Sequence, residues 1–301
     1  MINGVINIYK EKGFTSHDVV AKLRGILHQK KIGHTGTLDP DAQGVLPVCL
    51  GRATKLCDML TDKSKIYEAE VLLGTVTDTQ DSTGTVLSQQ EVHVTEDEIR
   101  SVLASFEGEQ MQIPPMYSAL KVNGKRLYEL AREGIEVERK ARKVHFYEIT
   151  LLEVNLPRFK VRVHCSKGTY IRTLCYDVGE KLNCGACMDS LLRTKVERFC
   201  LADSYKLGQV EELMHAGRIM DAVTPIDQMF SEYAAVQVPA ELERMIYNGN
   251  RFLAALLKEE AASSRTQGWY RVYDSGSRFQ GIYEYRAEED MFLPVKMFLE
   301  Q

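Results

Sequence analysis

The sequence lacks a long apolar run. A membrane-spanning helix needs about 20 consecutive apolar residues, and no segment of the 301-residue chain approaches that length. The opening residues, MINGVINIYKEKG, also lack the apolar core of a secretory signal peptide. We therefore expect a cytoplasmic protein without a membrane span. Its 44% hydrophobic and 27% charged residues are typical of an ordinary globular chain.

A disulfide framework is lacking as well. The seven cysteines form an odd and scattered set, unlike the paired cysteines of small secreted proteins. Cys184 and Cys187 form the one Cys-x-x-Cys pair in the sequence. Because a structural zinc site needs about four ligands and no second pair follows at a suitable spacing, we expect buried thiols and no metal site.

An overall positive charge, which would favour a nucleic-acid partner, is also missing. The formal net charge is −4, but its distribution is uneven. Residues 1–65 carry ten Lys and Arg against six Asp and Glu, and residues 121–172 carry thirteen against six. Such basic blocks bind phosphates, although a charged run can equally be solvated surface. The charge pattern therefore leaves an RNA partner open.

Strand and helix patterns are mixed without a regular alternation. Apolar residues at every second position predict strands at 67–73 and 160–165, and a shorter strand is expected at 5–9. Helical periodicity predicts helices at 15–28, 95–104 and from about 169 to 182. Thr15 with Asp18, and Thr95 with Glu98, are start signals for the first two helices. Because strands and helices do not alternate as βαβ units, we predict an α+β fold.

The composition changes near Ser231. Beyond it we expect a short strand at 234–238, a helix started by Pro239, and two β runs at 269–273 and 278–285. A segment of about 70 residues is near the lower limit for folding alone, so it should dock on the larger part. We therefore predict a main domain at 1–231 and a small β-rich module at 232–301.

The densest motif is GHTGTLDPDAQGVL at residues 33–46. Its glycines are typical of a backbone that makes special turns or admits a close approach. Asp39 precedes Pro40, which restricts Asp39 to extended conformations and offers its carboxylate no N–H. Taken alone, the Asp-Pro pair favours a helix N-cap.

This motif resembles the active-site signature of the TruB family, the bacterial-type tRNA pseudouridine-55 synthases. The resemblance continues at residues 3–16, 65–74, 112–132, 165–174 and 191–194. It implies a pseudouridine synthase fold with a central mixed, largely antiparallel sheet, an RNA-gripping insertion at about 108–145, and a PUA-like C-terminal module. The chain departs from the family at Glu11, where proline is usual, and at Cys187, where histidine is frequent.

The resemblance also implies catalytic roles. Asp39 would be the catalytic carboxylate, Arg172 would pair with it and keep it ionised, and Tyr67 would stack on the extruded uracil. From the residues alone, Arg172 is an ordinary surface arginine and Tyr67 a core tyrosine. His34 would fill the space vacated by the flipped nucleotide, although a histidine in a turn by itself indicates only surface.

Further residues are implied as RNA contacts. Basic and apolar side chains alternate in residues 121–143, an arrangement that suits phosphates and bases but also a solvated amphipathic segment. The expected RNA-contacting set is Lys10, His34, Lys121, Lys125, Arg126, Arg132, Arg142, Lys143, Lys167 and Leu191.

The implied activity is isomerisation of uridine to pseudouridine at position 55 in the T-arm loop of tRNA. The base must leave its stack before the sugar carbon is reachable, so base flipping is expected. Side chains alone could run this chemistry, so we expect no cofactor and no metal. We also expect a monomer without an obligatory protein partner. The alternatives are a non-catalytic tRNA-binding or tRNA-folding protein on the same scaffold, and a relative guided by a small RNA.

Overall fold

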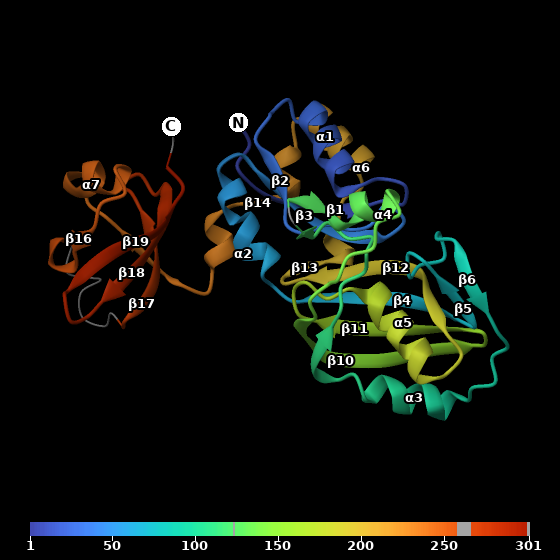
Figure 1. The fold of residues 1–301 in the computed structure, drawn as a ribbon. Helices are drawn as coiled ribbons and strands as arrows, with labels where there is room; N and C mark the ends of the chain where they lie inside the picture. The colour runs from blue at the N-terminus through green and yellow to red at the C-terminus, as the bar shows by residue number, and fades with distance from the viewer. Residues whose placement is uncertain (123, 258–265, 300–301) are drawn as a thin grey trace.

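The computed structural model describes residues 1–122, 124–257 and 266–299. The remaining positions, 123, 258–265 and 300–301, fall within the expected insertion and C-terminal module and lie outside the described residues. Helices and strands are mixed along the chain (Figure 1). Among the described helices, none is long and apolar enough to cross a membrane.

A ten-stranded sheet, counted over the described residues, lies at the centre of the larger part of the molecule. Its order is β14-β1-β3-β12-β4-β11-β10-β7, with β2 beside β3 and β13 beside β12. Within the described ranges, β3 and β12 pair in parallel and the other neighbours are antiparallel. The strands are β1 (Gly4–Lys10), β2 (Ile32–His34), β3 (Gln43–Leu50), β4 (Lys65–Leu73), β7 (Gly108–Gln112), β10 (Arg142–Asn155), β11 (Arg158–Cys165), β12 (Ala186–Val196), β13 (Phe199–Cys200) and β14 (Val223–Thr224).

Helices cover each half of this sheet (Figure 1). Helices α1 (Ser16–Ile26) and α6 (Leu207–His215) pack on β1 and β3, while α3 (Glu96–Ala104) and α5 (Ile171–Lys181) pack on β4, β10 and β11. Both expected start signals are capping boxes, since Thr15 and Thr95 accept from the backbone N–H groups of Asp18 and Glu98. The predicted strands and helices of the larger part are therefore confirmed, and the helix expected from about residue 169 begins at Ile171.

The two halves of the sheet meet at a short parallel contact between β3 and β12, here called the β3–β12 seam. In the described chain, two residue pairs are in register there, Gln43 with Leu192 and Gly44 with Arg193. Gly44 has a φ of +105°, and a Cβ on it would lie 2.2 Å from the Arg193 carbonyl oxygen. Any residue with a side chain at position 44 would therefore push the strands apart.

Short elements connect these parts. The hairpin of β5 (Thr75–Thr77) and β6 (Val86–Gln89) follows β4 and projects beyond the sheet (Figure 1). The helix α2 (Cys57–Thr61) precedes β4. The expected insertion at 108–145 contains β7, the two-residue strands β8 (Lys121–Val122) and β9 (Lys125–Arg126), α4 (Leu127–Arg132) and the start of β10.

The C-terminal part forms a separate five-stranded sheet, counted over the residues described there. The predicted β runs correspond to β15 (Ala234–Gln237), β17 (Gly268–Tyr273) and β18 (Phe279–Arg286), joined by β16 (Phe252–Leu253) and β19 (Met291–Met297). The helix expected after Pro239 is α7 (Glu243–Tyr247), preceded by a 3-10 turn. The predicted α+β class, with a central mixed sheet and a small β-rich C-terminal sheet, is confirmed.

The C-terminal sheet docks on the central part through a shared apolar cluster. Ile282 and Phe298 are buried in one cluster with Phe230 of the connecting segment and with residues of β3. Two polar contacts reinforce the junction, because Arg52 Nη1 donates to the Phe298 carbonyl at 2.8 Å and Lys55 Nζ donates to the Met297 carbonyl at 2.7 Å.

Candidate active site

Asp39 lies in the loop that joins β2 to β3. Its carbonyl accepts from the Ala42 N–H at 3.1 Å, which closes a single turn, and β3 then begins at Gln43. No helix occurs in the described stretch between Asp39 and β3. The helix N-cap interpretation of Asp39 and Pro40 is therefore wrong.

Two contacts from neighbouring elements anchor the Asp39 loop. Lys10 is 0% exposed, and its Nζ donates to the Pro40 carbonyl at 3.0 Å. The Leu38 N–H donates to Ser16 Oγ at 2.9 Å. Burial lowers the pKa of Lys10 to about 8. We expected a direct contact between Lys10 and RNA, but its ammonium is turned toward the Pro40 and Glu11 carbonyls, so Lys10 supports the loop instead.

Arg172 lies in the first turn of α5 and is buried, which overturns its interpretation as a surface arginine. Its Nε lies 2.9 Å from Asp39 Oδ2, and its Nη2 donates to Asp39 Oδ1 at 3.3 Å. The same guanidinium donates to the Thr79 carbonyl at 2.9 Å and to the Tyr117 carbonyl at 2.8 Å. Such a bidentate pair fixes both the position and the orientation of a carboxylate.

Asp81 is a site residue that sequence reasoning missed. Its Oδ2 lies 3.7 Å from Arg172 Nη1, on the same guanidinium that holds Asp39. Its Oδ1 accepts from Thr79 Oγ1 at 2.8 Å and from the Thr83 N–H at 3.1 Å. The signal was the segment DTQDST at 78–83, whose acidic and hydroxyl residues are typical of a tight polar turn. Arg172 therefore lies between two carboxylates.

The charge state of Asp39 reflects these neighbours. Burial raises the pKa of Asp39 above its ordinary value, and Asp81 raises it further, whereas Arg172 and Lys10 lower it. The side chain keeps a 40% exposed fraction, so a ligand can reach it. An ionised Asp39 in this loop therefore depends on Arg172 as its counter-charge.

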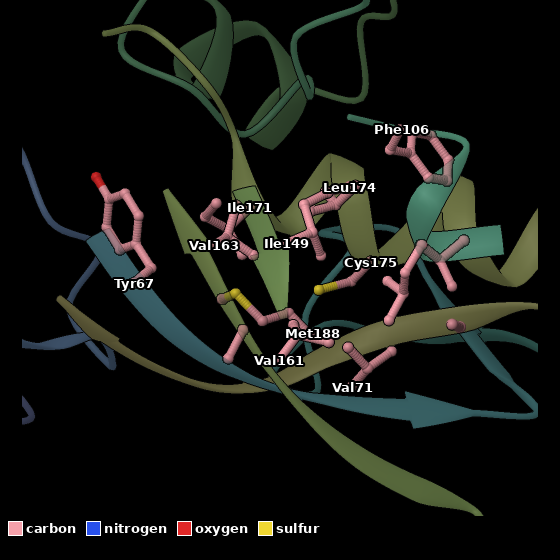
Figure 2. Close-up of a cluster of buried hydrophobic side chains, with 14 of the residues drawn as sticks. Tyr67, Val71, Phe106, Ile149, Val161, Val163, Ile171, Leu174, Cys175 and Met188 are labelled. Atoms are coloured by element: carbon pink, nitrogen blue, oxygen red, sulfur yellow. The ribbon is translucent and has the colours of Figure 1, made fainter. Parts of the chain in front are cut away.

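Tyr67 lies at the edge of the apolar core that includes Leu38 and Ala42, two residues of the Asp39 loop. Figure 2 shows its ring to one side of the aliphatic cluster, with the hydroxyl pointing away from it. Burial raises the pKa of Tyr67, while the charge of the neighbouring Arg193 lowers it. The ring of Tyr67 is therefore part of the apolar core, and its hydroxyl is a polar group at the edge of that core.

Arg193 is a second residue that sequence reasoning missed. It is 1% exposed and lies on β12, two positions after Leu191. The segment LLRT at 191–194 is part of the family resemblance, but the resemblance implies a role for Leu191 alone. Leu191 is partly buried and packs against the same core as Tyr67.

His34 lies at the end of β2, just before the Asp39 loop. Its ring makes an edge contact with His17, with centroids 5.3 Å apart, and its Nδ1 accepts from the Gly36 N–H at 3.4 Å. Burial lowers the pKa of His34, which favours the neutral ring. His34 is therefore partly buried beside the start of the Asp39 loop, and its interpretation as simple surface does not hold.

The basic residues expected at the RNA surface are mostly exposed, but some of them already form an ion pair with a carboxylate. Arg126 and Arg132 flank the Tyr128 ring, with guanidinium carbons 5.7 and 5.4 Å from its centroid. Lys143 and Lys167 already form ion pairs, at 2.6 Å with Glu109 and at 2.7 Å with Asp62. The exposed members of the set are Lys121, Lys125, Arg126, Arg132, Arg142, Lys143 and Lys167.

The insertion contacts the site directly, because the Tyr117 carbonyl accepts from Arg172. The structure therefore brings Asp39, Arg172 and Asp81 together beside the core that holds Tyr67, with His34 at the start of the loop, while the exposed cations lie on the insertion and, for Lys167, in the turn after β11. Across the described part of the chain, no group of three or more His, Cys, Asp or Glu side chains is arranged to hold a metal. Cys184 and Cys187 are buried.

Comparisons with known proteins cover nearly the whole chain. Residues 24–171 match the family model "TruB family pseudouridylate synthase (N terminal domain)", and residues 172–231 match "tRNA pseudouridylate synthase B C-terminal domain". A tRNA pseudouridine synthase B of Lachnoclostridium phytofermentans is 51% identical over 307 residues, which cover 99% of this chain and 100% of the relative. One from Clostridium kluyveri is 45% identical over 300 residues, with 99% and 100% covered.

Solved structures show the same fold. A crystal structure of a Cbf5-Nop10-Gar1 complex contains a chain with a TM-score of 0.72 and 26% identity, covering 98% of this chain and 85% of that one. Another similar fold, with a TM-score of 0.71 and 24% identity, occurs in an H/ACA RNP bound to a substrate RNA containing 2'-deoxyuridine, where 99% of this chain and 85% of that chain are covered. The chain therefore belongs to the TruB family of pseudouridylate synthases, enzymes of the isomerase class.

Proposed function

We propose that this protein converts uridine 55 in the T-arm loop of tRNA to pseudouridine, with Asp39 as its catalytic carboxylate. The observation that carries the proposal is the two-point contact of buried Arg172 with Asp39, next to Tyr67. The tRNA substrate is supported by the names of relatives that match the full chain.

The chemistry breaks the N1–C1′ bond, rotates the base, and joins C1′ to C5. The C5 hydrogen leaves as a proton and N1 gains one, so no electrons are exchanged with a cofactor. The step needs a carboxylate that attacks C1′ or stabilises a sugar cation. In both cases Asp39 acts in its ionised form, and Arg172 supplies the charge that favours this form.

The uridine reaches Asp39 by leaving its stack. In this proposal its base lies against the Tyr67 ring, and His34, close to the loop, fills the space that the nucleotide vacates. The Tyr67 hydroxyl, which points away from the apolar cluster (Figure 2), is the group that would exchange a proton with the sugar.

We further propose a division of labour along the chain. Residues 1–231 would form the catalytic domain, residues 108–145 its RNA-gripping insertion, and residues 232–301 a PUA-like module that holds RNA. Exposed Lys121, Lys125, Arg126, Arg132 and Arg142 would contact phosphates, with Tyr128 available to a sugar or base. Lys143 and Lys167 would exchange their carboxylate partners for phosphates, and Leu191 would pack against the bound nucleotide. We expect the chain to act as a monomer, without a cofactor or protein partner, in the cytoplasm.

The rival function is tRNA binding or folding without catalysis. Burial holds the pKa of Asp39 above its ordinary value, so an ionised carboxylate at this place costs stability. A protein that only binds RNA gains nothing from a carboxylate that a buried arginine holds in a fixed orientation. A catalyst, in contrast, benefits from it.

The test is to incubate the protein with unmodified tRNA transcript and to map pseudouridine at each position. Wild type should modify position 55, and Asp39→Asn should make no pseudouridine while keeping tRNA affinity within about tenfold. Asp41→Asn is the matched control, because Asp41 is 51% exposed and lies 3.9 Å from Lys12. Pseudouridine formation by an Asp39→Asn preparation free of deamidation would refute the role of Asp39, and normal tRNA binding by a wild type without activity would favour the rival.

A further inference from the structure

Arg193 occupies a central position in the sheet. On β12 it is the register partner of Tyr67 on β4 and of Gly44 on β3, so it lies where the two halves of the sheet join. Its side chain is 1% exposed. The half that contains β3 includes the Asp39 loop, and the half that contains β4 includes Tyr67.

The Arg193 guanidinium is bound to the half of the sheet that contains β3. Its Nε donates to the Val45 carbonyl at 2.7 Å, and its Nη2 donates to the Gly36 carbonyl at 3.4 Å, at the start of the Asp39 loop. On the other side the register partner of Arg193 is Tyr67 of β4, so the two side chains lie next to each other on one face of the sheet, and Arg193 lowers the pKa of Tyr67. Two contacts from one planar group therefore tie β3 and the start of the Asp39 loop to the direct neighbour of Tyr67.

The charge of Arg193 is not neutralised locally. Within the described residues it forms no ion pair, and its hydrogen-bond partners are backbone carbonyls. It also lies close enough to Lys10, Lys65 and His34 to lower the pKa of each. A buried cation among other cations costs free energy, and folding alone would be served as well by an apolar residue of similar size.

We propose that Arg193 is a positioning residue, which holds the Tyr67 hydroxyl at a fixed place relative to the Asp39 loop. This inference rests on the proposed function, in which Tyr67 and Asp39 act on the same nucleotide. Arg193 itself does not touch the substrate. Its effect on turnover passes through Tyr67.

The test uses the full-length variants Arg193→Met and Arg193→Lys, each alone and combined with Tyr67→Phe. The single-turnover rate at saturating tRNA should fall about 30-fold or more for Arg193→Met, with the tRNA dissociation constant within about threefold of wild type. In the Tyr67→Phe background the same change should cost less than about threefold, because the partner is already gone. Lysine should restore part of the rate. Arg162→Met is the matched control, because Arg162 is an exposed arginine of the same sheet, paired with Glu68 at 2.8 Å.

A substrate-free measurement separates coupling from a merely structural effect. The ultraviolet titration of Tyr67, taken as the difference between each protein and its Tyr67→Phe counterpart, should move to higher pH in Arg193→Met, since Arg193 lowers the pKa of Tyr67. A folded Arg193→Met protein with the wild-type rate and titration would overturn the inference. So would independent rate losses, in which the double variant is slowed by the product of the two single-variant factors. If Arg193→Met does not fold, the same cycle with Arg193→Lys decides. A wild type that makes no pseudouridine refutes the proposed function instead, and the titration still reports on Arg193.

Discussion

The guanidinium of Arg172 holds both oxygens of Asp39, at 2.9 and 3.3 Å, although the two residues are 133 positions apart in the sequence. The pair joins a loop in one half of the sheet to a helix that covers the other half. Its geometry therefore depends on the whole fold.

Arg172→Lys should slow the reaction more than it weakens RNA binding. Lysine keeps the charge, but a single ammonium cannot contact both carboxylate oxygens and two carbonyls in the same fixed plane. We expect a single-turnover rate about 100-fold lower, or about 2.7 kcal/mol, with tRNA affinity changed by less than about threefold. Arg162→Lys, on the exposed face of the sheet, serves as control. A variant as fast as wild type would show that the two-point contact is dispensable.

Asp39→Asn should stabilise the folded protein at neutral pH. Because folding raises the pKa of Asp39, the folded state holds this proton more tightly than the unfolded chain does. The free energy of unfolding therefore falls as pH rises from the pKa of Asp39 in the unfolded chain, about 3.9, through its pKa in the folded protein. The loss persists at higher pH. Urea unfolding at several pH values should show that the gain from asparagine shrinks as the pH is lowered. Asp41→Asn is the control, and a neutral-pH loss of stability in Asp39→Asn would contradict the prediction.

Gly44→Ala should disrupt the β3–β12 seam. The new Cβ would lie 2.2 Å from a backbone oxygen, at a φ that non-glycine residues rarely adopt. We expect a loss of about 3 kcal/mol or more in the free energy of unfolding, measured by denaturant titration. Gly208→Ala is the matched control, because nothing lies within 4 Å of its added Cβ and it belongs to helix α6. Equal stability of the two variants would mean that the strands can separate without cost.

Phe298→Ala should loosen the contact between the two sheets. Phe298 is 1% exposed, with its ring centroid 6.1 Å from that of Phe230 and 5.7 Å from that of Phe279. Removing the ring should cost about 3 kcal/mol, measured by denaturant titration of the full chain. Val295→Ala, at 44% exposure, should change stability little. A Phe298→Ala protein as stable as this control would show that the junction contributes little.

Local patterns accounted for much of the fold. The two capping boxes and the alternating strands β4 and β11 depend on residues close in the sequence, so they could be predicted. The order of the strands and the seam could not, because they depend on contacts between distant segments. The Asp39-Pro40 pair was misread for the same reason, since the turn it forms is fixed by contacts with Lys10 and Ser16.

The catalytic candidates were predicted through their resemblance to a family, and the residues that support them were not. Arg193 stands beside polar Thr194 and Lys195, a pattern that indicates a solvent-facing position. Register irregularities in β12, between Met188 and Ser190 and between Arg193 and Lys195, break the simple alternation that the pattern assumes. Asp81 was missed because a turn sequence does not reveal which helix packs against it.

Lys10 combines an unusually low pKa with a side chain that solvent does not reach. Burial is the main cause of this low pKa, so the amine regains the ordinary pKa of a lysine whenever its side chain becomes exposed. An acylating reagent should label Lys10 slowly, because its exposed fraction is 0% and its Nζ is bound to the Pro40 carbonyl. The labelling rate of Lys10 would then report how often the Asp39 loop moves away from β1, so this amine would serve as a chemical probe of loop opening.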